Sequence, residues 1–385
     1  MSKKLLIILY LFCLVVSCTR KNKVVNPLEH VLTSENVKIK RVMDSLDKYE
    51  VQIKFTQINR LNDRTIFKDY DFQVNDNNYF YPASTVKFPI AVLAMEKLNQ
   101  IDSLNKDTRF YVEGDTVETT FANDVSKIFA ISDNLANNRL VEFLGQDWIN
   151  AKLKQKRIFS VRISHRLSTE NADEITTKPV IVYLNDSTTT AIESTINTSP
   201  KPLEINKIKK GIGYVSEDSL MNEPFSFALK NYYPINAQHE VLKRIIFPED
   251  FDENERFNLD NEQRDIILKA MHTLPKEVGY DPIDYYDSYV KFFMFGDTKK
   301  DMPEHIKIYS KVGSAYGTLT DCAYILDTKN KVEFMLTATL LVNKNAIFND
   351  DTYEYDEVGI PFLAQLGRDL YNYELNRKKQ KSWIN

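Results

Sequence analysis

The residues with the clearest chemical potential are serines followed three positions later by a lysine. This S-x-x-K spacing occurs four times, beginning at Ser45, Ser84, Ser103 and Ser288. On a helix, two side chains three positions apart lie on neighbouring parts of one face. An amine in that position could take the proton of the hydroxyl and turn it into a nucleophile. The spacing alone does not indicate which of the four serines could be a nucleophile. The residues around each serine must be considered as well.

The surroundings favour Ser84. It begins an apolar segment that runs to Leu98 and is predicted to be helical. The unpaired N–H groups and the positive dipole at a helix start can stabilise a developing oxyanion. An apolar helix would also bury Lys87 and lower the pKa of its amine, so that it could act as a base. The other three serines lie in charged stretches or within a predicted helix, where solvated helix contacts explain them.

A second motif, Ser132-Asp133-Asn134, stands at the predicted start of another helix. All three residue types favour helix capping, which is the purely structural interpretation. Beside a Ser–Lys pair, however, the Ser132 hydroxyl could carry a proton to a leaving group. The Asn134 side chain could hold a substrate amide.

A third motif, Lys311-Val312-Gly313-Ser314, stands at the end of a predicted strand. A lysine at a strand end is usually solvated, but Gly313 permits the close approach of another backbone segment. Lys311 could then bind a substrate carboxylate. The N–H groups of Ser84 and Ser314 could form an oxyanion hole.

Together the motifs resemble the S-x-x-K, S-D-N and K-T-G set of class A serine β-lactamases and other penicillin-recognising serine hydrolases. Longer stretches match as well, from Ser132 to Val141 and from Lys311 to Asp321. The resemblance extends from about Pro27 to the C-terminus and is weakest between residues 169 and 258. It implies an α/β (α+β) fold of the β-lactamase type, an α/β/α sandwich with a five-stranded antiparallel sheet and an all-helical lobe.

The resemblance implies that Ser84 opens a β-lactam amide through an acyl-enzyme, with roles in β-lactam catabolism and antibiotic resistance. The implied catalytic residues are Ser84, Lys87, Ser132 and Glu170, and the implied substrate-binding residues are Asn134, Lys311, Gly313 and Ser314. One alternative is a D,D-peptidase, penicillin-binding-type acyltransferase or esterase that deacylates poorly, with a peptidoglycan-like peptide as substrate. Another is a non-catalytic envelope lipoprotein that keeps the fold as a binding module.

Two departures from the family pattern keep these alternatives open. The family's deacylating glutamate lies in an E-x-x-L-N motif that this chain lacks. Glu170 is the nearest carboxylate and Glu174 the next, although a surface role would explain either. Val312 replaces the usual hydroxyl residue of the K-T-G motif. The loss of that hydroxyl removes one hydrogen bond to a substrate carboxylate. Such a bond is worth about 1–3 kcal/mol when the partner group is left unpaired.

The elements that must position these residues follow from hydrophobic periodicity. Predicted helices span residues 27–48, 84–98, 124–144, 147–156, 261–274, 285–295 and 358–375. Predicted strands span residues 49–59, 65–74, 180–184, 306–311, 318–327 and 331–342. Strands from both ends of the chain would form one antiparallel sheet, with a helical lobe at about 84–300 between them. The polar stretch at about 169–219 is predicted to be an insertion.

The N-terminus predicts export. Lys3 and Lys4 precede an apolar run that is too short to span a bilayer comfortably, and the run ends at Val15-Val16-Ser17-Cys18. This ending resembles a bacterial lipobox, although a plain secretory signal is the alternative. Residues 1–18 would then be a lipoprotein signal peptide, 19–26 a tether and 27–385 the hydrolase domain. The implied location is beyond the inner membrane, with Cys18 lipid-anchored in the cell envelope (periplasm or outer membrane).

The composition of the chain indicates which classes of protein, ligand and cofactor are expected. The 385 residues are 43% hydrophobic and carry a formal net charge of −4, which favours a large core and gives no sign of nucleic-acid binding. Only Cys322 would remain in a mature chain, where we expect a core residue without a disulfide. The five histidines lack metal-ligand spacing, so we expect no metal and no cofactor. The expected partners are a small-molecule substrate and the membrane, and the protein is expected to be a monomer.

Overall fold

The computed structural model describes residues 26–61 and 64–382, with the side chains of residues 380–382 left out. The predicted signal segment, its lipidation site Cys18 and the tether up to residue 25 lie outside the described residues, so they stay predictions. Within the described part of the chain, no helix combines the length and the apolar character needed to cross a membrane.

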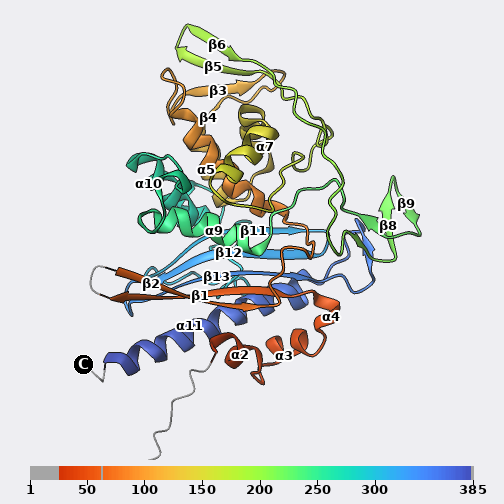
Figure 1. Ribbon diagram of the computed structural model, residues 1–385, viewed down its shortest axis with the longest axis vertical. Coiled ribbons are helices and arrows are strands. Elements are labelled where there is room, and N and C mark those ends of the chain that lie inside the picture. The colour runs from red at the N-terminus through yellow and green to blue at the C-terminus, as the bar shows by residue number, and fades with distance from the viewer. Residues whose placement is uncertain (1–25, 62–63, 383–385) are drawn as a thin grey trace, which may run out of the picture.

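A five-stranded antiparallel sheet divides the molecule (Figure 1). Its strand order is β11 (Ile306–Ala315), β12 (Thr318–Asp327), β13 (Val332–Leu341), β1 (Gln52–Leu61) and β2 (Arg64–Phe72). The N-terminal hairpin joins the C-terminal three strands through the pairing of β1 with β13. This arrangement confirms the predicted sheet built from both ends of the chain.

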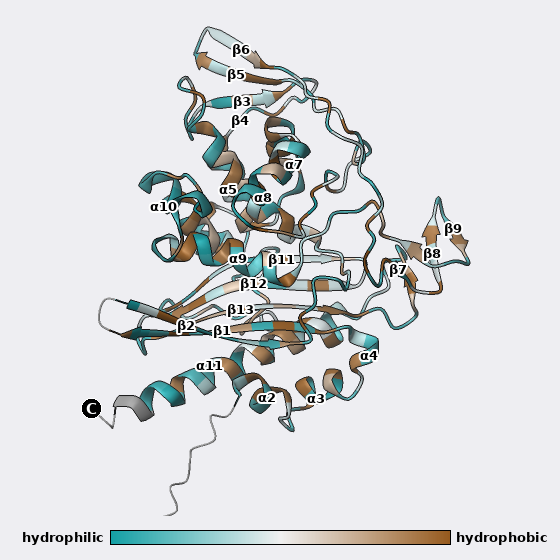
Figure 2. Ribbon diagram, in the orientation of Figure 1, coloured by the Kyte–Doolittle hydropathy of each residue, from teal (hydrophilic) through white to brown (hydrophobic). Residues whose placement is uncertain are grey.

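One face of the sheet is covered by helices from the two ends of the chain (Figure 1): α2 (Pro27–Leu32), α3 (Val37–Met43), α4 (Leu46–Tyr49) and α11 (Ile360–Ser382). Hydrophobic and hydrophilic residues alternate along α11 in Figure 2, as a helix with one buried face requires. The single helix predicted over residues 27–48 is broken into three. Asn36 begins a new helix there, because its side chain accepts a hydrogen bond from the backbone N of Lys38.

The other face is covered by α9 and α10 and by the lobe above them, which is built from α5, α6, α7 and α8 (Figures 1 and 2). These helices span Lys87–Leu98 (α5), Phe121–Ala130 (α6), Asn134–Leu144 (α7), Gln146–Gln155 (α8), Ile235–Ile246 (α9) and Asn261–His272 (α10). Helix α5 is buried on almost every side, which explains why its sequence is apolar all round. The predicted helix at 124–144 is two helices, and α9 had no predicted counterpart.

Short turns complete the helical structure. Single 3₁₀ turns lie at Ala83–Val86 (η1), Pro248–Asp250, Glu253–Glu255 and Pro275–Val278, and a π-helical turn at Tyr355–Gly359 leads into α11. The helix predicted over residues 285–295 is absent, and turns replace it. One reason is Asp321 of β12, whose carboxylate accepts the backbone N–H groups of Phe292 and Phe293 that a helix would have used internally.

The first half of the predicted insertion extends the lobe. Strands β5 (Val180–Asn185) and β6 (Thr188–Ile192) form a hairpin, and β5 pairs with β3 (Arg109–Val112), which pairs with β4 (Thr119–Thr120). The lobe therefore carries a four-stranded sheet at its far end as well as its helices (Figure 1).

The second half of the insertion lies at the end of the central sheet, beside the chain that follows β13. Strands β8 (Gly213–Ser216) and β9 (Ser219–Met221) form a hairpin, and β8 pairs with β14 (Ile347–Phe348) in parallel. Strand β7 (Lys209–Lys210) pairs with β10 (Phe225–Ser226). The insertion therefore continues past residue 219 and packs against the C-terminal part of the chain.

Cys322 lies in the core between the sheet and the lobe, as the sequence suggested. Its thiol donates to the backbone carbonyl of Gln238 at 3.4 Å, and the Thr337 hydroxyl donates to its sulfur at 3.3 Å. Complete burial raises the pKa of this thiol.

A buried ion pair ties α6 to α7. The Arg139 guanidinium donates to both carboxylate oxygens of Asp124, at 2.7 and 2.8 Å, and the Thr119 hydroxyl donates to the same carboxylate. Both charged side chains are buried in the lobe. The pair therefore holds the start of α7, which carries the Ser132 motif, against α6.

Replacing Arg139 with Met should destabilise the protein by about 3–5 kcal/mol, because it leaves the Asp124 carboxylate buried without its ionic partner. Urea unfolding followed by circular dichroism would measure the loss. The double variant Asp124→Leu/Arg139→Met should recover most of the stability, since it removes the buried charge as well. Equal stability of the single variant and the wild type would contradict the assigned role of the pair.

Candidate active site

Ser84 lies in turn η1, directly before helix α5, at the edge of an open cleft of about 540 Å³. The cleft lies between the end of β11 and the lobe, and Asn134 and Ser314 also line it. Ala83 has a φ of 47°, in the left-handed region that non-glycine residues rarely adopt. Ser84 is half-buried, so its hydroxyl can meet a molecule in the cleft.

Gly313 brings strand β11 against this turn. A Cβ atom on Gly313 would lie 2.8 Å from the backbone O of Pro82 and 2.9 Å from the backbone N of Ser84. No residue with a side chain fits there without moving the turn. The predicted close approach at Gly313 is therefore made to the backbone of Ser84 itself, and Ser314 is the next residue along the strand.

Lys87 lies one turn along the helix from Ser84 and is fully buried. Its Nζ contacts the backbone O of Ser132 at 2.5 Å, the Ser132 hydroxyl at 3.3 Å and Oδ1 of Asn134 at 2.6 Å. Burial lowers the pKa of this amine to about 7, an effect that the charge of Asp133 only partly opposes. A large share of Lys87 is therefore neutral at neutral pH and available as a base.

Lys311 also contacts Ser132. Its Nζ donates to the Ser132 hydroxyl at 2.8 Å and to the backbone O of Val312 at 2.9 Å. Burial, together with the positive charges of Lys87 and Lys291, lowers the pKa of Lys311. The Ser132 hydroxyl therefore lies between two buried amines, an arrangement suited to passing a proton from one group to another.

Asp133, rather than Ser132, caps the helix. Its side chain accepts the backbone N–H of Ala136 at 2.8 Å. Ser132 has a φ of 59°, which breaks the predicted helix between α6 and α7. Capping by Asp133 leaves the Ser132 and Asn134 side chains available to contact Lys87.

The structure thus gathers most of the predicted site residues. Lys87 and Lys311 both contact the Ser132 hydroxyl, Gly313 lies against the backbone of Ser84, and Asn134 and Ser314 line the same cleft as Ser84. Val312 is not among the residues that line the cleft; it packs in the core on the α11 side of the sheet.

Glu170 and Glu174 lie outside this group of residues. Both are exposed, and neither lines the cleft. Their loop is anchored by buried Arg166, which donates to both carboxylate oxygens of Glu142 and to the backbone O of Glu174. The loop is therefore held so that it presents its backbone and short side chains, Ser168 and Thr169, to the cleft. Among the described residues that line the cleft, Asp351 is the only acid.

The aromatic walls of the cleft were not predicted from the sequence. Four tyrosines line it: Tyr81, Tyr316, Tyr353 and Tyr355. Two of their hydroxyls are occupied, because Tyr353 accepts the backbone N–H of Asn349 and Tyr355 accepts that of Gly317. Tyr81 directly precedes the Pro82-Ala83-Ser84 turn, so only its position near the motif could have indicated this role.

His165 also lines the cleft, with its ring parallel to that of Tyr81. Its Nδ1 faces the backbone O of Arg166 at 2.5 Å, which requires the hydrogen to be on Nδ1. Its buried Nε2 has no hydrogen-bond partner among the described residues. Burial lowers the pKa of His165 to about 4, so the ring is neutral at neutral pH.

A third buried lysine lies behind Lys311. Lys291 donates to the backbone O of Met271 at 2.7 Å and contacts the hydroxyl of Ser310 at 3.3 Å. Burial lowers the pKa of Lys291 and raises that of Asp321. Lys291 belongs to the S-x-x-K spacing at Ser288, so this repeat of the motif is a core feature rather than a solvated helix contact.

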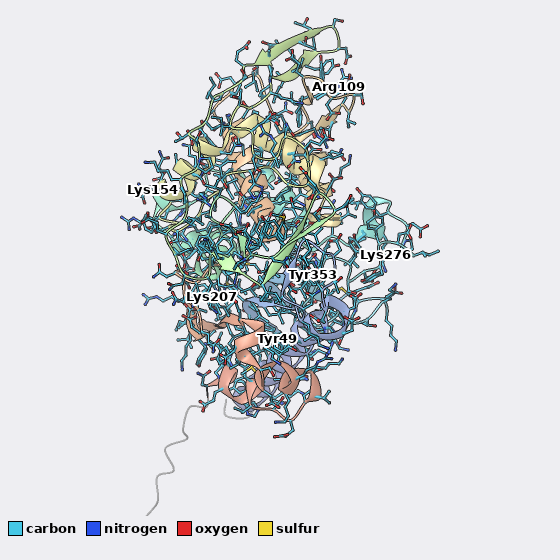
Figure 3. The ribbon with its side chains drawn as sticks, turned by 90° about the vertical axis from the view of Figure 1, so that its right-hand side faces the viewer. Tyr49, Arg109, Lys154, Lys207, Lys276 and Tyr353 are labelled. Atoms are coloured by element: carbon cyan, nitrogen blue, oxygen red, sulfur yellow. The ribbon has the colours of Figure 1, made fainter. Side chains whose placement is uncertain are left out.

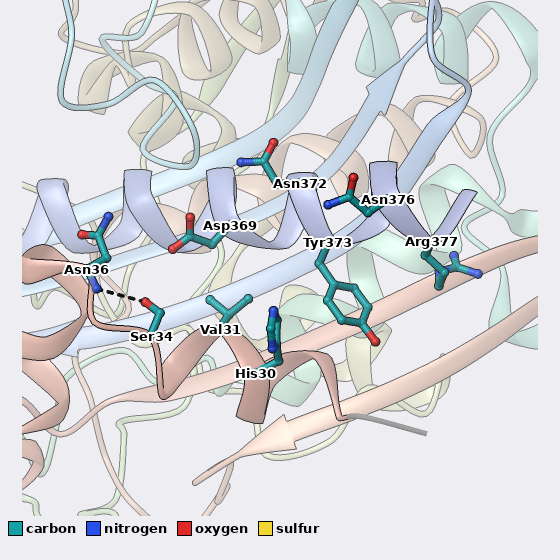
Figure 4. A pocket seen from close by; sticks show the side chains of 9 residues that line it. All are labelled: His30, Val31, Ser34, Asn36, Asp369, Asn372, Tyr373, Asn376 and Arg377. Atoms are coloured by element: carbon teal, nitrogen blue, oxygen red, sulfur yellow. Dashed lines mark hydrogen bonds between the residues drawn. The ribbon is translucent and has the colours of Figure 1, made fainter. Parts of the chain in front are cut away.

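A separate hollow lies between α2 and α11, on the far side of the sheet (Figure 4). Figure 4 shows His30 and Val31 of α2 facing Asp369, Tyr373 and other residues of α11. None of the predicted site residues lines this hollow, so it is not part of the candidate active site.

Comparison with known proteins finds one family profile and several similar folds. Residues 37–195, which include Ser84 and Ser132, match the profile of the family described as the β-lactamase enzyme family. The fold is similar to that of a protein titled PBP-A, with a TM-score of 0.51 and 13% identity over 91% of this chain and 96% of that chain. It is also similar to a β-lactamase from Desulfarculus baarsii DSM 2075, with a TM-score of 0.50 and 14% identity over 89% of this chain and 98% of that chain.

No curated protein sequence matches the chain. The solved structures, at these identities, define a β-lactamase type of fold. The family profile matches residues 37–195, which is less than half of the chain.

Replacing Gly313 with Ala should slow acylation of the protein by a serine-directed probe by about 10²-fold, because the new methyl group must displace the backbone at Ser84. Labelling rates with a fluorescent penicillin would measure the effect. Gly213→Ala in β8 is the matched control, since a Cβ there would also meet a backbone atom, the O of Met221 at 2.8 Å, but Gly213 does not line the cleft. Labelling of Gly313→Ala at the control rate would show that the close approach does not position Ser84.

Proposed function

We propose that the protein opens β-lactam amides through an acyl-enzyme on Ser84. The observation that carries the proposal is the pair of buried lysines at the Ser132 hydroxyl, beside the turn that holds Ser84. This hydroxyl lies 3.3 Å from Nζ of Lys87 and 2.8 Å from Nζ of Lys311, while Gly313 touches the backbone of Ser84. This group of residues would supply a nucleophile, a base and a proton path in one place.

In the proposed acylation, the Ser84 hydroxyl attacks the lactam carbonyl and gives its proton to the neutral amine of Lys87. The C–N bond of the lactam then breaks. The Ser132 hydroxyl gives its proton to the departing nitrogen and regains one from Lys87. The backbone N–H groups of Ser84 and Ser314 would stabilise the oxyanion. Lys311 would attract a substrate carboxylate by its charge when protonated.

Release of the acyl group by hydrolysis requires an activated water, and Asp351 is the one acid among the described residues that line the cleft. Glu170 and Glu174 are exposed and do not line it. This observation favours a second candidate within the same proposal: a D,D-peptidase or penicillin-binding-type enzyme whose β-lactam adduct persists. In that case the natural acyl group would come from a peptide, and an acceptor other than a well-positioned water could release it.

Penicillin should add its full mass to the protein at a 1:1 ratio, and the adduct should persist for minutes or longer. Intact-mass spectrometry of a chain beginning at residue 19 would measure both the adduct and its lifetime. Ser84→Ala should show no adduct, because the nucleophile is gone. Glu170→Gln and Glu174→Gln should leave the lifetime unchanged, because neither carboxylate lines the cleft.

The formation and lifetime of the adduct distinguish a β-lactamase, a peptidase-type enzyme and a binding module. An adduct that forms and disappears within seconds would favour a β-lactamase over the peptidase type. A longer lifetime in Glu170→Gln would restore that residue as the water-activating base. A wild-type protein that forms no adduct with penicillins, cephalosporins or a fluorophosphonate would refute the proposed function and leave a binding module on this fold.

The acylation rate should rise about tenfold per pH unit below pH 7 and level off above it. Lys87 acts as a base only when neutral, and its pKa of about 7 sets the pH at which half of it has lost its proton. Stopped-flow labelling between pH 5 and 9 would measure this profile. Lys87→Arg should be inactive throughout, because its guanidinium stays charged. A wild-type rate that is constant from pH 5 to 8 would refute the role of Lys87.

A further inference from the structure

A second pocket, of about 530 Å³, lies below the active-site cleft on the same side of the molecule. The ends of α3 and α4, residues 207–211 and the chain that follows β13 surround it. Figure 3 shows this side: Lys207 and Tyr49 belong to the pocket, and Tyr353, above them, belongs to the cleft. None of the predicted catalytic residues lines the pocket.

The lining of this pocket is strongly cationic. Six basic side chains contribute to it, against two carboxylates, in a chain whose formal net charge is −4. The basic residues are Arg41, Lys48, Lys207, Lys209, Lys210 and Lys344. Such a concentration of one sign of charge in a concave surface attracts ions of the opposite sign.

The two carboxylates leave part of this charge unbalanced. Glu50 pairs with Lys210, which is buried, and lies 3.6 Å from Lys207. Glu354 accepts the backbone N–H of Lys344. Among the described residues, the side-chain amines of Lys48, Lys209 and Lys344 have no recorded carboxylate or hydrogen-bond partner. Three ammonium groups are therefore available to a ligand.

The pocket also has an apolar part. Leu341, Phe348 and Val358 line it together with the ring of Tyr49. Phe348 and Val358 are almost completely buried, so they form a firm inner surface beneath the charged groups. A small inorganic anion would contact only the ammonium groups. A ligand with both an anionic group and an apolar part would contact both.

We propose that this pocket binds a phosphate ester that carries an apolar part. The ammonium groups of Lys48, Lys209 and Lys344 would contact the phosphate, and the apolar part would lie against Phe348 and Val358. An anionic phospholipid and a soluble phosphate ester share this chemistry. The segment from Asn343 to Val358 separates the pocket from the cleft, since Phe348 and Val358 face the pocket while Tyr353 and Tyr355 line the cleft.

The test compares ligands and charge-matched variants of the chain beginning at residue 19, which keeps every described element. Binding to vesicles of phosphatidylglycerol and of phosphatidylcholine would be measured by sedimentation, and binding of phenyl phosphate, a soluble ester with an apolar part, by calorimetry. The variant Lys48→Gln/Lys209→Gln/Lys344→Gln removes the unpaired charges. The control Lys154→Gln/Lys178→Gln/Lys300→Gln removes three exposed lysines that lie outside the pocket.

We expect saturable binding to phosphatidylglycerol vesicles, about 100-fold weaker in the pocket variant and within a few-fold of wild type in the control. Saturable binding of phenyl phosphate with the same variant pattern would support the site and identify a soluble ester as a ligand. Equal losses in the two variants would indicate non-specific charge attraction and overturn the proposal. Absence of saturable binding to both ligands would overturn it as well.

Discussion

The candidate active site depends on the absence of one side chain, at Gly313. Strand β11 belongs to the C-terminal part of the chain and turn η1 to the N-terminal part, yet their backbones touch where a Cβ atom would not fit. The sheet makes this contact possible, because β1 pairs with β13 and so joins the two ends of the chain. Once β11 lies against η1, the alternation of the strand directs Lys311 toward Ser132 and Val312 into the opposite core.

Three lysines are buried near this contact, and their burial costs stability. Lys87, Lys291 and Lys311 are all withdrawn from water, and Asp321 is the one carboxylate buried beside them in the described structure. An ammonium group is costly to bury, so each amine tends to lose its proton instead. The fold thus gives up stability that three apolar residues would have supplied. It gains amines that can accept protons at neutral pH, which a site of proton transfer requires.

Much of this could be predicted from local sequence, and the misses have physical causes. The strands of the central sheet have strong alternation, and the apolar run after Ser84 could only be a buried helix. Helix α9 was missed because it lies in the region of weakest resemblance. The helix predicted at 285–295 failed because Asp321, distant in sequence, takes its backbone N–H groups. Glu170 was chosen by its proximity in sequence to an expected loop, while Arg166 holds that loop in an orientation that turns Glu170 to solvent.

The environment of Cys322 makes its thiol a probe for opening of the core. Its sulfur is enclosed between β12, β13 and α9, and its raised pKa suppresses the reactive thiolate. In a chain that begins at residue 19, this is the only thiol. A thiol reagent can modify it only after the central sheet separates from α9, whereas fluctuations of the cleft loops leave it protected. The rate at which Cys322 is modified in native buffer would therefore measure how often the core opens. This rate would not depend on what occupies the cleft.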